Sequence, residues 1–270
     1  MPASRRAETS LDDDFALLKD AVAEAGALAA SFYGGNLDHW KKADDDTPVS
    51  EADLAVDKLL KERLHDSRPA YGWLSEESGD DDARLSCQRV WVVDPIDGTH
   101  AFINTRPHWT ISAALVELGR PVLACVFNPL TDEFFTARAN AGARLNGNPI
   151  TTTDRTEIGG CRMLANGHAF APGRWSEPWP DMEIDYRNSV AYRLCLVASG
   201  AYDAALAISA KSDWDIAAAD LVVREAGGQA SDCHGGPLVY NRRTLRHKTI
   251  LAAGPRLYKA LLRRTRKFKI

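Results

Sequence analysis

The stretch RVWVVDPIDGT, residues 89–99, limits what this chain can fold into more than any other part of it. An apolar run long enough for a buried strand leads directly to Asp94, and Asp97 follows three residues later. A carboxylate at the edge of a core loses its water, which is costly unless something compensates its charge. A tight turn, a salt bridge or a bound cation could each provide that compensation.

The bulk composition is that of an ordinary globular protein, with 45% hydrophobic and 26% charged residues. A chain of 270 residues can bury the core of one large or two modest domains. The formal net charge of −4 gives no electrostatic reason to expect DNA or another nucleic acid as a partner.

The five cysteines are widely separated, odd in number and without a CxxC pair. They therefore predict neither a disulfide framework nor a zinc site. The first 15 residues lack an apolar signal core, and no run approaches the roughly 18 apolar residues of a membrane span. The sequence predicts a cytoplasmic protein that does not associate with membranes.

Helical periodicity dominates the first part of the chain. Apolar residues recur at helical spacing over residues 11–33, and Gly34 ends that pattern. A second helix is expected to begin near Glu51, with Ser50 as its cap. Strand patterns follow, and residues 109–129 predict a hairpin whose turn contains a Gly-Arg pair.

The pattern changes near residue 150, where helices begin to alternate with short strands. We therefore expect an N-terminal α+β half, residues 1–150, which carries most of the candidate ligands. The C-terminal α/β half, residues 151–270, would supply Asp215 and contacts to a substrate. The overall fold class is α/β, with α+β character in the first half.

Acidic residues recur where apolar strands end or helices begin. Glu76 follows one strand, Asp94 ends another, and Asp215 opens a helix. Strand ends in an α/β protein meet at one crevice. Converging carboxylates repel each other unless a proton or a cation neutralises them. Because Mg²⁺ is held in proteins by a few carboxylates, waters and substrate phosphate, the pattern favours a magnesium site.

The residues within DPIDGT favour a metal site over a simple turn. Pro95 fixes φ and lacks an N–H group, which predicts a sharp turn after Asp94 and leaves the Ile96 carbonyl as a further oxygen ligand. Gly98 permits unusual dihedral angles, and Thr99 adds a hydroxyl beside N–H groups that could hold phosphate. A capped turn is the alternative, because Asp-Gly is a common turn pair. The apolar strand before the motif favours the metal.

Four motifs follow one another along almost the whole chain: PVSEAD, EES, WVVDPIDGT and WDIAAADLVVREAGG. In this order they resemble the inositol monophosphatase superfamily of Mg²⁺-dependent, lithium-sensitive phosphomonoesterases. The resemblance implies a layered αβαβα sandwich, of the type shared with fructose-1,6-bisphosphatase, and a homodimer. It also implies two or three Mg²⁺ ions as cofactor, with Mn²⁺ as a substitute.

The same resemblance implies a role for each ligand of the metals. Glu76, Asp94 and the Ile96 carbonyl would hold a first metal. Asp94 would bridge to a second metal, which Asp97 and Asp215 would also hold.

Other residues would serve the reaction and the substrate. Thr99 would hydrogen-bond the attacking water, and Asp53 would lie just outside the ligands, near a third metal. The backbone of Gly98 and Thr99 would hold phosphate oxygens. The implied catalytic residues are Glu76, Asp94, Asp97, Thr99 and Asp53. The candidate substrate contacts are Gly98, Thr99, His100, Asn188, Ser189, Lys211 and Asp215.

Residues around these motifs indicate the class of substrate. The stretch DPIDGTHAFINTRPHW resembles the 3′(2′),5′-bisphosphate nucleotidase and histidinol-phosphatase branches more than the animal-type inositol monophosphatases. It departs from those branches at His100, where they often carry Arg. Inositol monophosphatases often carry a Glu near the position of Ile208, and its absence argues against an inositol-specific pocket. Lys211 is a candidate contact for a second phosphate or another anion.

The sequence therefore predicts a phosphoric monoester hydrolase for a small phosphorylated metabolite, acting through a metal-activated water. Its substrate would be an inositol phosphate or a 3′(2′),5′-bisphosphate nucleotide, and histidinol phosphate is an alternative. An alternative of another class is a regulatory protein-interaction role with residual phosphatase activity, because some superfamily members are regulatory partners of the transcription machinery. The complete set of implied ligands favours the enzyme.

Overall fold

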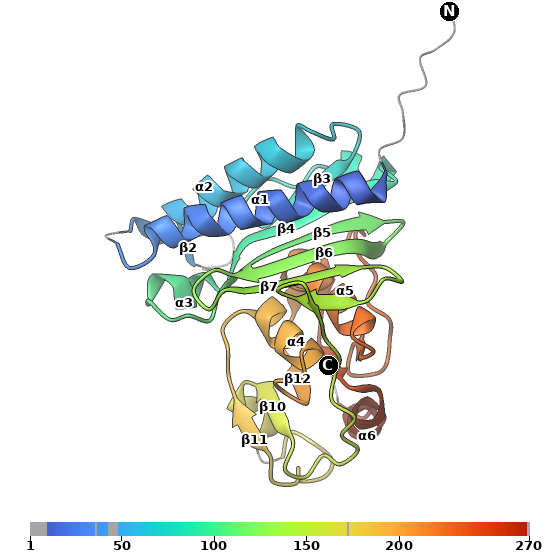
Figure 1. The fold of residues 1–270 in the computed structure, drawn as a ribbon. Coiled ribbons are helices and arrows are strands. Elements are labelled where there is room, and N and C mark those ends of the chain that lie inside the picture. Colours follow the sequence, from blue (N-terminus) through green and yellow to red (C-terminus); the bar gives the residue numbers. More distant parts are fainter. Residues whose placement is uncertain (1–9, 36, 43–47, 172, 269–270) are drawn as a thin grey trace, which may run out of the picture.

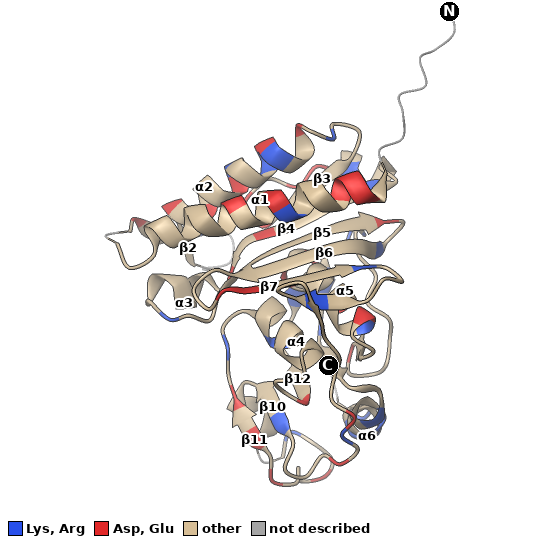
Figure 2. Ribbon diagram, viewed as in Figure 1, with Lys and Arg blue, Asp and Glu red and all other residues tan. Residues whose placement is uncertain are grey.

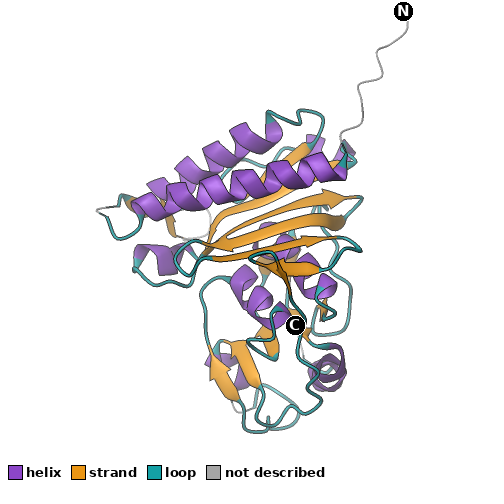
Figure 3. Ribbon diagram, in the orientation of Figure 1, coloured by secondary structure: helices purple, strands orange, loops and turns teal. Residues whose placement is uncertain are grey.

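Two main sheets and the helices that cover them stack in alternating layers (Figure 1). The computed structural model describes residues 10–35, 37–42, 48–171 and 173–268. The predicted αβαβα sandwich is confirmed, as the alternation of helices and strands through the molecule shows (Figure 3).

Each layer of helices covers a face of a sheet. Helices α1 (Leu11–Phe32) and α2 (Glu51–Leu60) pack on one face of a seven-stranded sheet. Helices α4 (Val190–Ala198) and α5 (Asp213–Glu225) fill the space between this sheet and a five-stranded sheet. Helix α6 (Pro255–Thr265) packs on the far face of the five-stranded sheet.

The first two helices begin where the sequence predicts. The hydroxyl of Ser10 accepts a hydrogen bond from the Asp13 N–H at 3.1 Å and caps α1. Acidic residues gather at this positive end of α1, whereas basic residues gather on α6 (Figure 2). Ser50 caps α2, and a π-helical turn, η1 (Lys61–His65), continues that helix.

The seven-stranded sheet has the order β3-β4-β5-β6-β7-β8-β9. Strand β3 runs parallel to β4, and every later pair is antiparallel. The predicted hairpin of β5 and β6 is confirmed, but its turn is at Leu118 and Gly119, one residue before the expected Gly119–Arg120, because Arg120 already pairs with Glu117. The strands are β3 (Gly72–Ser75), β4 (Arg89–Asp97), β5 (Thr110–Glu117), β6 (Arg120–Asn128), β7 (Glu133–Arg138), β8 (Ala143–Leu145) and β9 (Asn148–Pro149).

Strand β4 contains an irregularity where a sharp turn was expected. Asp94 pairs with Ser112 and Asp97 pairs with Thr110, so two residues of β4 lie opposite one residue of β5. Pro95 cannot donate to the ladder, and the strand absorbs it as a bulge without leaving the sheet. The expectation of a sharp turn after Asp94 was therefore wrong, because the pairing with β5 resumes at Asp97.

The five-stranded sheet has the order β11-β10-β12-β16-β14, with β11 at one edge. Its strands are β10 (Arg162–Ala165), β11 (Glu183–Asp185), β12 (Ala204–Ala207), β14 (Gln229–Ser231) and β16 (Ile250–Ala253). The shorter elements are β1 (His39–Lys41), β2 (Pro48–Ser50), α3 (Thr99–Ile103), β13 (Lys211–Ser212), β15 (Arg246–His247), η2 (Asp82–Ser86) and η3 (Gly167–Phe170).

The change of pattern near residue 150 falls between the last strand of one main sheet and the first strand of the other. Helix α5 nevertheless packs against the seven-stranded sheet, so the core between the sheets contains residues from both parts of the chain. The division into halves at residue 150 stays a prediction. All five cysteines are free, as expected. Among the described residues, every helix is too short or too polar to cross a membrane.

Candidate metal centre

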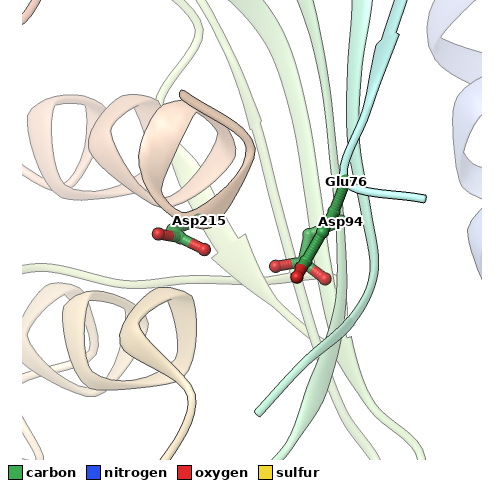
Figure 4. A group of neighbouring side chains, drawn as sticks. All are labelled: Glu76, Asp94 and Asp215. Atoms are coloured by element: carbon green, nitrogen blue, oxygen red, sulfur yellow. The ribbon is translucent and has the colours of Figure 1, made fainter. Parts of the chain in front are cut away.

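Three carboxylates from separate elements meet between the seven-stranded sheet and α5 (Figure 4). Glu76 directly follows β3, Asp94 lies in β4, and Asp215 lies in the first turn of α5. One oxygen from each residue lies within 4.8 Å of the corresponding oxygens of the other two. The sequence-based expectation that these three residues converge is therefore met by the fold.

Asp94 is the most isolated of these carboxylates. It is 1% exposed, and neither of its oxygens has a hydrogen-bond partner among the described residues. Burial raises its pKa well above the ordinary value, and neighbouring carboxylates, Glu76 foremost, raise it further. A carboxylate without water or a donor requires either a proton or a cation, and the surrounding carboxylates fit the second.

Asp215 is held by the start of its own helix. It forms a capping box with Ser212, whose N–H donates to Oδ2 of Asp215 at 2.7 Å. No hydrogen bond from the described residues to Oδ1 accompanies this one at Oδ2. Burial raises the pKa of Asp215 to about 7, the charge of Asp97 raises it, and the charge of Lys211 opposes the rise.

Asp53 repeats this arrangement at the start of α2. Its Oδ2 accepts hydrogen bonds from the N–H of Ser50 at 2.8 Å and from the hydroxyl of Ser50 at 2.5 Å. Its other oxygen, Oδ1, accepts from the hydroxyl of Thr99 at 3.1 Å. Burial raises the pKa of Asp53 to about 6, against the opposing effect of these hydrogen bonds. Asp53, which was predicted to lie just outside the metal ligands, therefore contacts Thr99, which was predicted to bind the attacking water.

Asp97 is the last residue of β4, and its carboxylate contacts the start of α4. Its Oδ2 accepts from the hydroxyl of Ser189 at 2.5 Å and from the N–H of Ala191 at 2.6 Å. Burial raises its pKa, although these bonds oppose the rise. Asp97 stands outside the group of three whose oxygens lie closest together, so its role as a ligand of a second metal stays a prediction.

Gly98 and Thr99 form the tight link between β4 and α3. Gly98 has a φ of +99°, and a Cβ there would lie 2.9 Å from the His108 carbonyl oxygen and 3.0 Å from the Ser189 nitrogen. Only glycine fits this position. The Thr99 hydroxyl also lies 3.1 Å from the Ile96 carbonyl oxygen, the oxygen expected to bind a metal.

Lys42 is a residue of this centre that sequence reasoning missed. Its Nζ lies 2.9 Å from Oε1 of Glu76 and 2.7 Å from Oε1 of Glu77. Burial alone would lower the pKa of Lys42, but these two carboxylates raise it above the ordinary value. Burial raises the pKa of Glu77 to about 7, while Lys42 opposes the rise. The sequence offered only a Lys-Lys pair in a polar segment, which is the usual pattern of a solvated loop.

The other residues predicted to contact the substrate differ in burial. Ser189 is buried, whereas Asn188 and Lys211 are half-buried. His100 is exposed, and its carbonyl accepts a hydrogen bond from Asn104 Nδ2 at 2.7 Å. Roles for these residues in substrate binding stay predictions.

The layered α/β fold brings carboxylates from strand ends and a helix start together, an arrangement that can hold a divalent cation. A sequence model described as the inositol monophosphatase family matches residues 11–270. The chain belongs to this family, whose members generally use Mg²⁺ and act on small phosphorylated substrates.

Individual relatives agree with this assignment. The Nus factor SuhB of Pasteurella multocida is 33% identical over 90% of this chain and 91% of its own. An inositol-1-monophosphatase of Rhizobium meliloti is 33% identical over 82% of this chain and 85% of its own. The crystal structure of the extragenic suppressor protein suhB from Bartonella henselae matches with a TM-score of 0.79 and 29% identity, over 93% of this chain and 98% of that one.

Proposed function

We propose that this protein is a Mg²⁺-dependent phosphomonoesterase that hydrolyses a small phosphorylated metabolite. The observation that carries this proposal is the buried carboxylate of Asp94, which accepts no hydrogen bond from the part of the chain that the structure describes and lies beside Glu76 and Asp215. A charge in this position is stable only when a cation shares it, and oxygen ligands of this kind suit Mg²⁺, with Mn²⁺ as a substitute.

The residues present fit two bound ions. Glu76, Asp94 and the Ile96 carbonyl would hold one, and Asp94, Asp97 and Asp215 would hold the other. When bound, Mg²⁺ lowers the pKa of a coordinated water and neutralises phosphoryl oxygens. A third, loosely held ion would lie near Asp53.

The chain's own groups would orient the attacking water. If the hydroxyl of Thr99 donates its hydrogen bond to Oδ1 of Asp53, its oxygen lone pairs remain able to accept a hydrogen bond from that water. Glu76 would accept the second hydrogen bond of the water. The N–H groups of Gly98 and Thr99 lie where α3 begins and would bind phosphoryl oxygens. Together these groups align water and phosphorus for in-line attack.

The substrate we propose is an inositol phosphate or a 3′(2′),5′-bisphosphate nucleotide, with histidinol phosphate as the second candidate. The charge of Lys211 acts on both Asp97 and Asp215, which supports a contact to an additional anionic group of the substrate. His100, Asn188 and Ser189 would complete the contacts around the leaving alcohol.

Substitution of Asp94 by Asn tests the proposal. With Mg²⁺ and a panel of adenosine 3′,5′-bisphosphate, inositol 1-phosphate, histidinol phosphate and fructose 1,6-bisphosphate, we expect the parent to release phosphate and Li⁺ to inhibit it. Asp94→Asn should lose this activity, whereas the exposed control Asp20→Asn should keep it. Turnover by Asp94→Asn at the parent's rate would overturn the catalytic assignment.

A regulatory role is the second candidate, because relatives named Nus factor SuhB match at 33% identity. Such a role would persist in Asp94→Asn, so the same variant separates the two functions. We also propose that the protein forms a homodimer and that it resides in the cytoplasm. The free cysteines support the second proposal, because a reducing compartment keeps thiols free. Light scattering of the purified protein measures the dimer directly.

A further inference from the structure

Tyr186 is a large aromatic residue that stays exposed at the edge of the candidate site. It directly follows β11 and is 43% exposed. Ser189, three residues later, donates its hydroxyl hydrogen to Asp97 at 2.5 Å. Three residues span at most about 10 Å, so the backbone of Tyr186 lies within that distance of the backbone of Ser189, whose hydroxyl contacts Asp97.

The ring of Tyr186 lies against a buried guanidinium. Cζ of Arg193 is 4.7 Å from the ring centre, and Arg193 is 5% exposed. The Nε of Arg193 donates to the Arg187 carbonyl at 2.6 Å, and its Nη2 donates to the Asn188 carbonyl at 3.1 Å. These two hydrogen bonds fix the guanidinium, and the guanidinium in turn fixes the ring.

This arrangement explains how a charge survives burial in this position. Burial lowers the pKa of Arg193, whereas Tyr186, Asp97 and Asp215 oppose that effect. A cation against an aromatic face is attracted by the electrons of the ring, and the attraction is stronger when water is excluded. One part of the ring is therefore covered by Arg193, and the rest remains open to solvent before any substrate binds.

We propose that Tyr186 is a stacking platform for a planar aromatic ring carried by the leaving alcohol of the substrate. The inference rests on the proposed phosphatase function and narrows its substrate class to phosphate monoesters that contain an aromatic heterocycle. Nucleotides and an imidazole-bearing alcohol share this chemistry. An exposed ring held in advance loses little freedom on binding, so it can contribute to affinity efficiently.

The exposed aromatic face of Tyr186 suits a flat ligand better than a polyol. A cyclic polyol gains little from an aromatic face, because its hydroxyl groups need hydrogen-bond partners on every side. The exposed ring of Tyr186 therefore favours an aromatic ring over inositol as its contact.

The test compares Tyr186→Leu with the matched control Tyr186→Phe, which keeps the ring. We expect kcat/KM for adenosine 3′,5′-bisphosphate or histidinol phosphate, whichever the parent prefers, to fall about tenfold in Tyr186→Leu. The loss should lie mainly in KM, Tyr186→Phe should stay near the parent, and inositol 1-phosphate should change less than about twofold. An equal loss on all substrates, or no loss on the aromatic ones, would overturn the platform.

Equilibrium binding separates this inference from the proposed function. Adenosine 5′-phosphate and ribose 5-phosphate differ only in the base, and calorimetry with Mg²⁺ present measures both. The parent should bind the first about tenfold more tightly, and Tyr186→Leu should remove that difference. If the parent releases no phosphate from any substrate yet shows this difference, only the phosphatase proposal fails. If the parent is a phosphatase without this difference, only the platform fails.

Discussion

Replacing Asp215 by Asn should stabilise the protein when metal is absent. Asn keeps an oxygen that can accept the Ser212 N–H, so the capping box of α5 survives, while the negative charge disappears. The folded protein raises the pKa of Asp215 from 3.8 to about 7, first through burial and then through Asp97. A carboxyl group with a raised pKa binds protons more tightly in the folded than in the unfolded chain.

The sign and size of the effect follow from this shift. Stability decreases as pH rises from about 4 to about 7, and the full penalty is present above the folded pKa. About three pKa units at 1.36 kcal/mol each give an upper bound of about 4 kcal/mol. Because the Asp215 side chain keeps partial contact with solvent, we expect roughly half, about 2 kcal/mol.

Calorimetry in EDTA near pH 8 measures the difference as a rise in Tm of about 4–8 °C for Asp215→Asn. The difference should shrink near pH 5, where the parent carboxyl is protonated. With excess Mg²⁺ the order should reverse, because a ligand at about 100 times its Kd stabilises the parent by about 2.7 kcal/mol. A variant less stable than the parent in EDTA at pH 8 would show that repulsion among the carboxylates is not the dominant effect.

Three further changes test other parts of the site. Lys42→Met removes the ammonium that competes for Glu76, so calorimetry should find Mg²⁺ bound several-fold more tightly; weaker binding would contradict the competition. Gly98→Ala should lower the free energy of unfolding by more than about 3 kcal/mol in urea, because strain at positive φ adds to the close contact. Gly142→Ala, with φ +80° and open space around it, isolates the strain alone at about 1 kcal/mol, and equal losses would refute the contact argument. Ser189→Ala should lower the free energy of unfolding by about 1 kcal/mol by removing the cap of α4, and it should weaken Mg²⁺ binding. Ser189→Thr should restore both. If Ser189→Ala changed neither, Ser189 would not hold α4 and Asp97 as described.

Much of the architecture could be predicted because local signals agreed with the final packing. The hairpin of β5 and β6 carries both a turn signal and apolar strands, and α2 begins at a serine cap. The convergence of Asp94 and Asp215 was predictable because strand ends and helix starts in a layered α/β fold meet at one crevice.

The other features could not be predicted because they depend on contacts between segments that are far apart in the sequence. Lys42 reaches Glu76 across 34 positions of the chain, and nothing in its polar neighbourhood marks that contact. The path of β4 through Pro95 depended on whether β5 would pair again beyond it, which local propensity does not determine. Arg193 reads as an ordinary helical arginine until its contact with Tyr186 is seen.

The hydrogen bonds that hold Asp97 and Asp215 bear on which ion the proposed metal centre would accept. Each residue has one carboxylate oxygen occupied by a donor, from Ser189 and Ala191 in one case and from Ser212 in the other. These donors favour binding of an ion through the other oxygen of each residue, because binding through both oxygens would compete with the hydrogen bonds at the helix starts. Calcium takes more and longer bonds and often binds both oxygens of a carboxylate, whereas magnesium accepts fewer and shorter ones. We therefore expect the first turns of α4 and α5 to favour the smaller ion at the proposed centre.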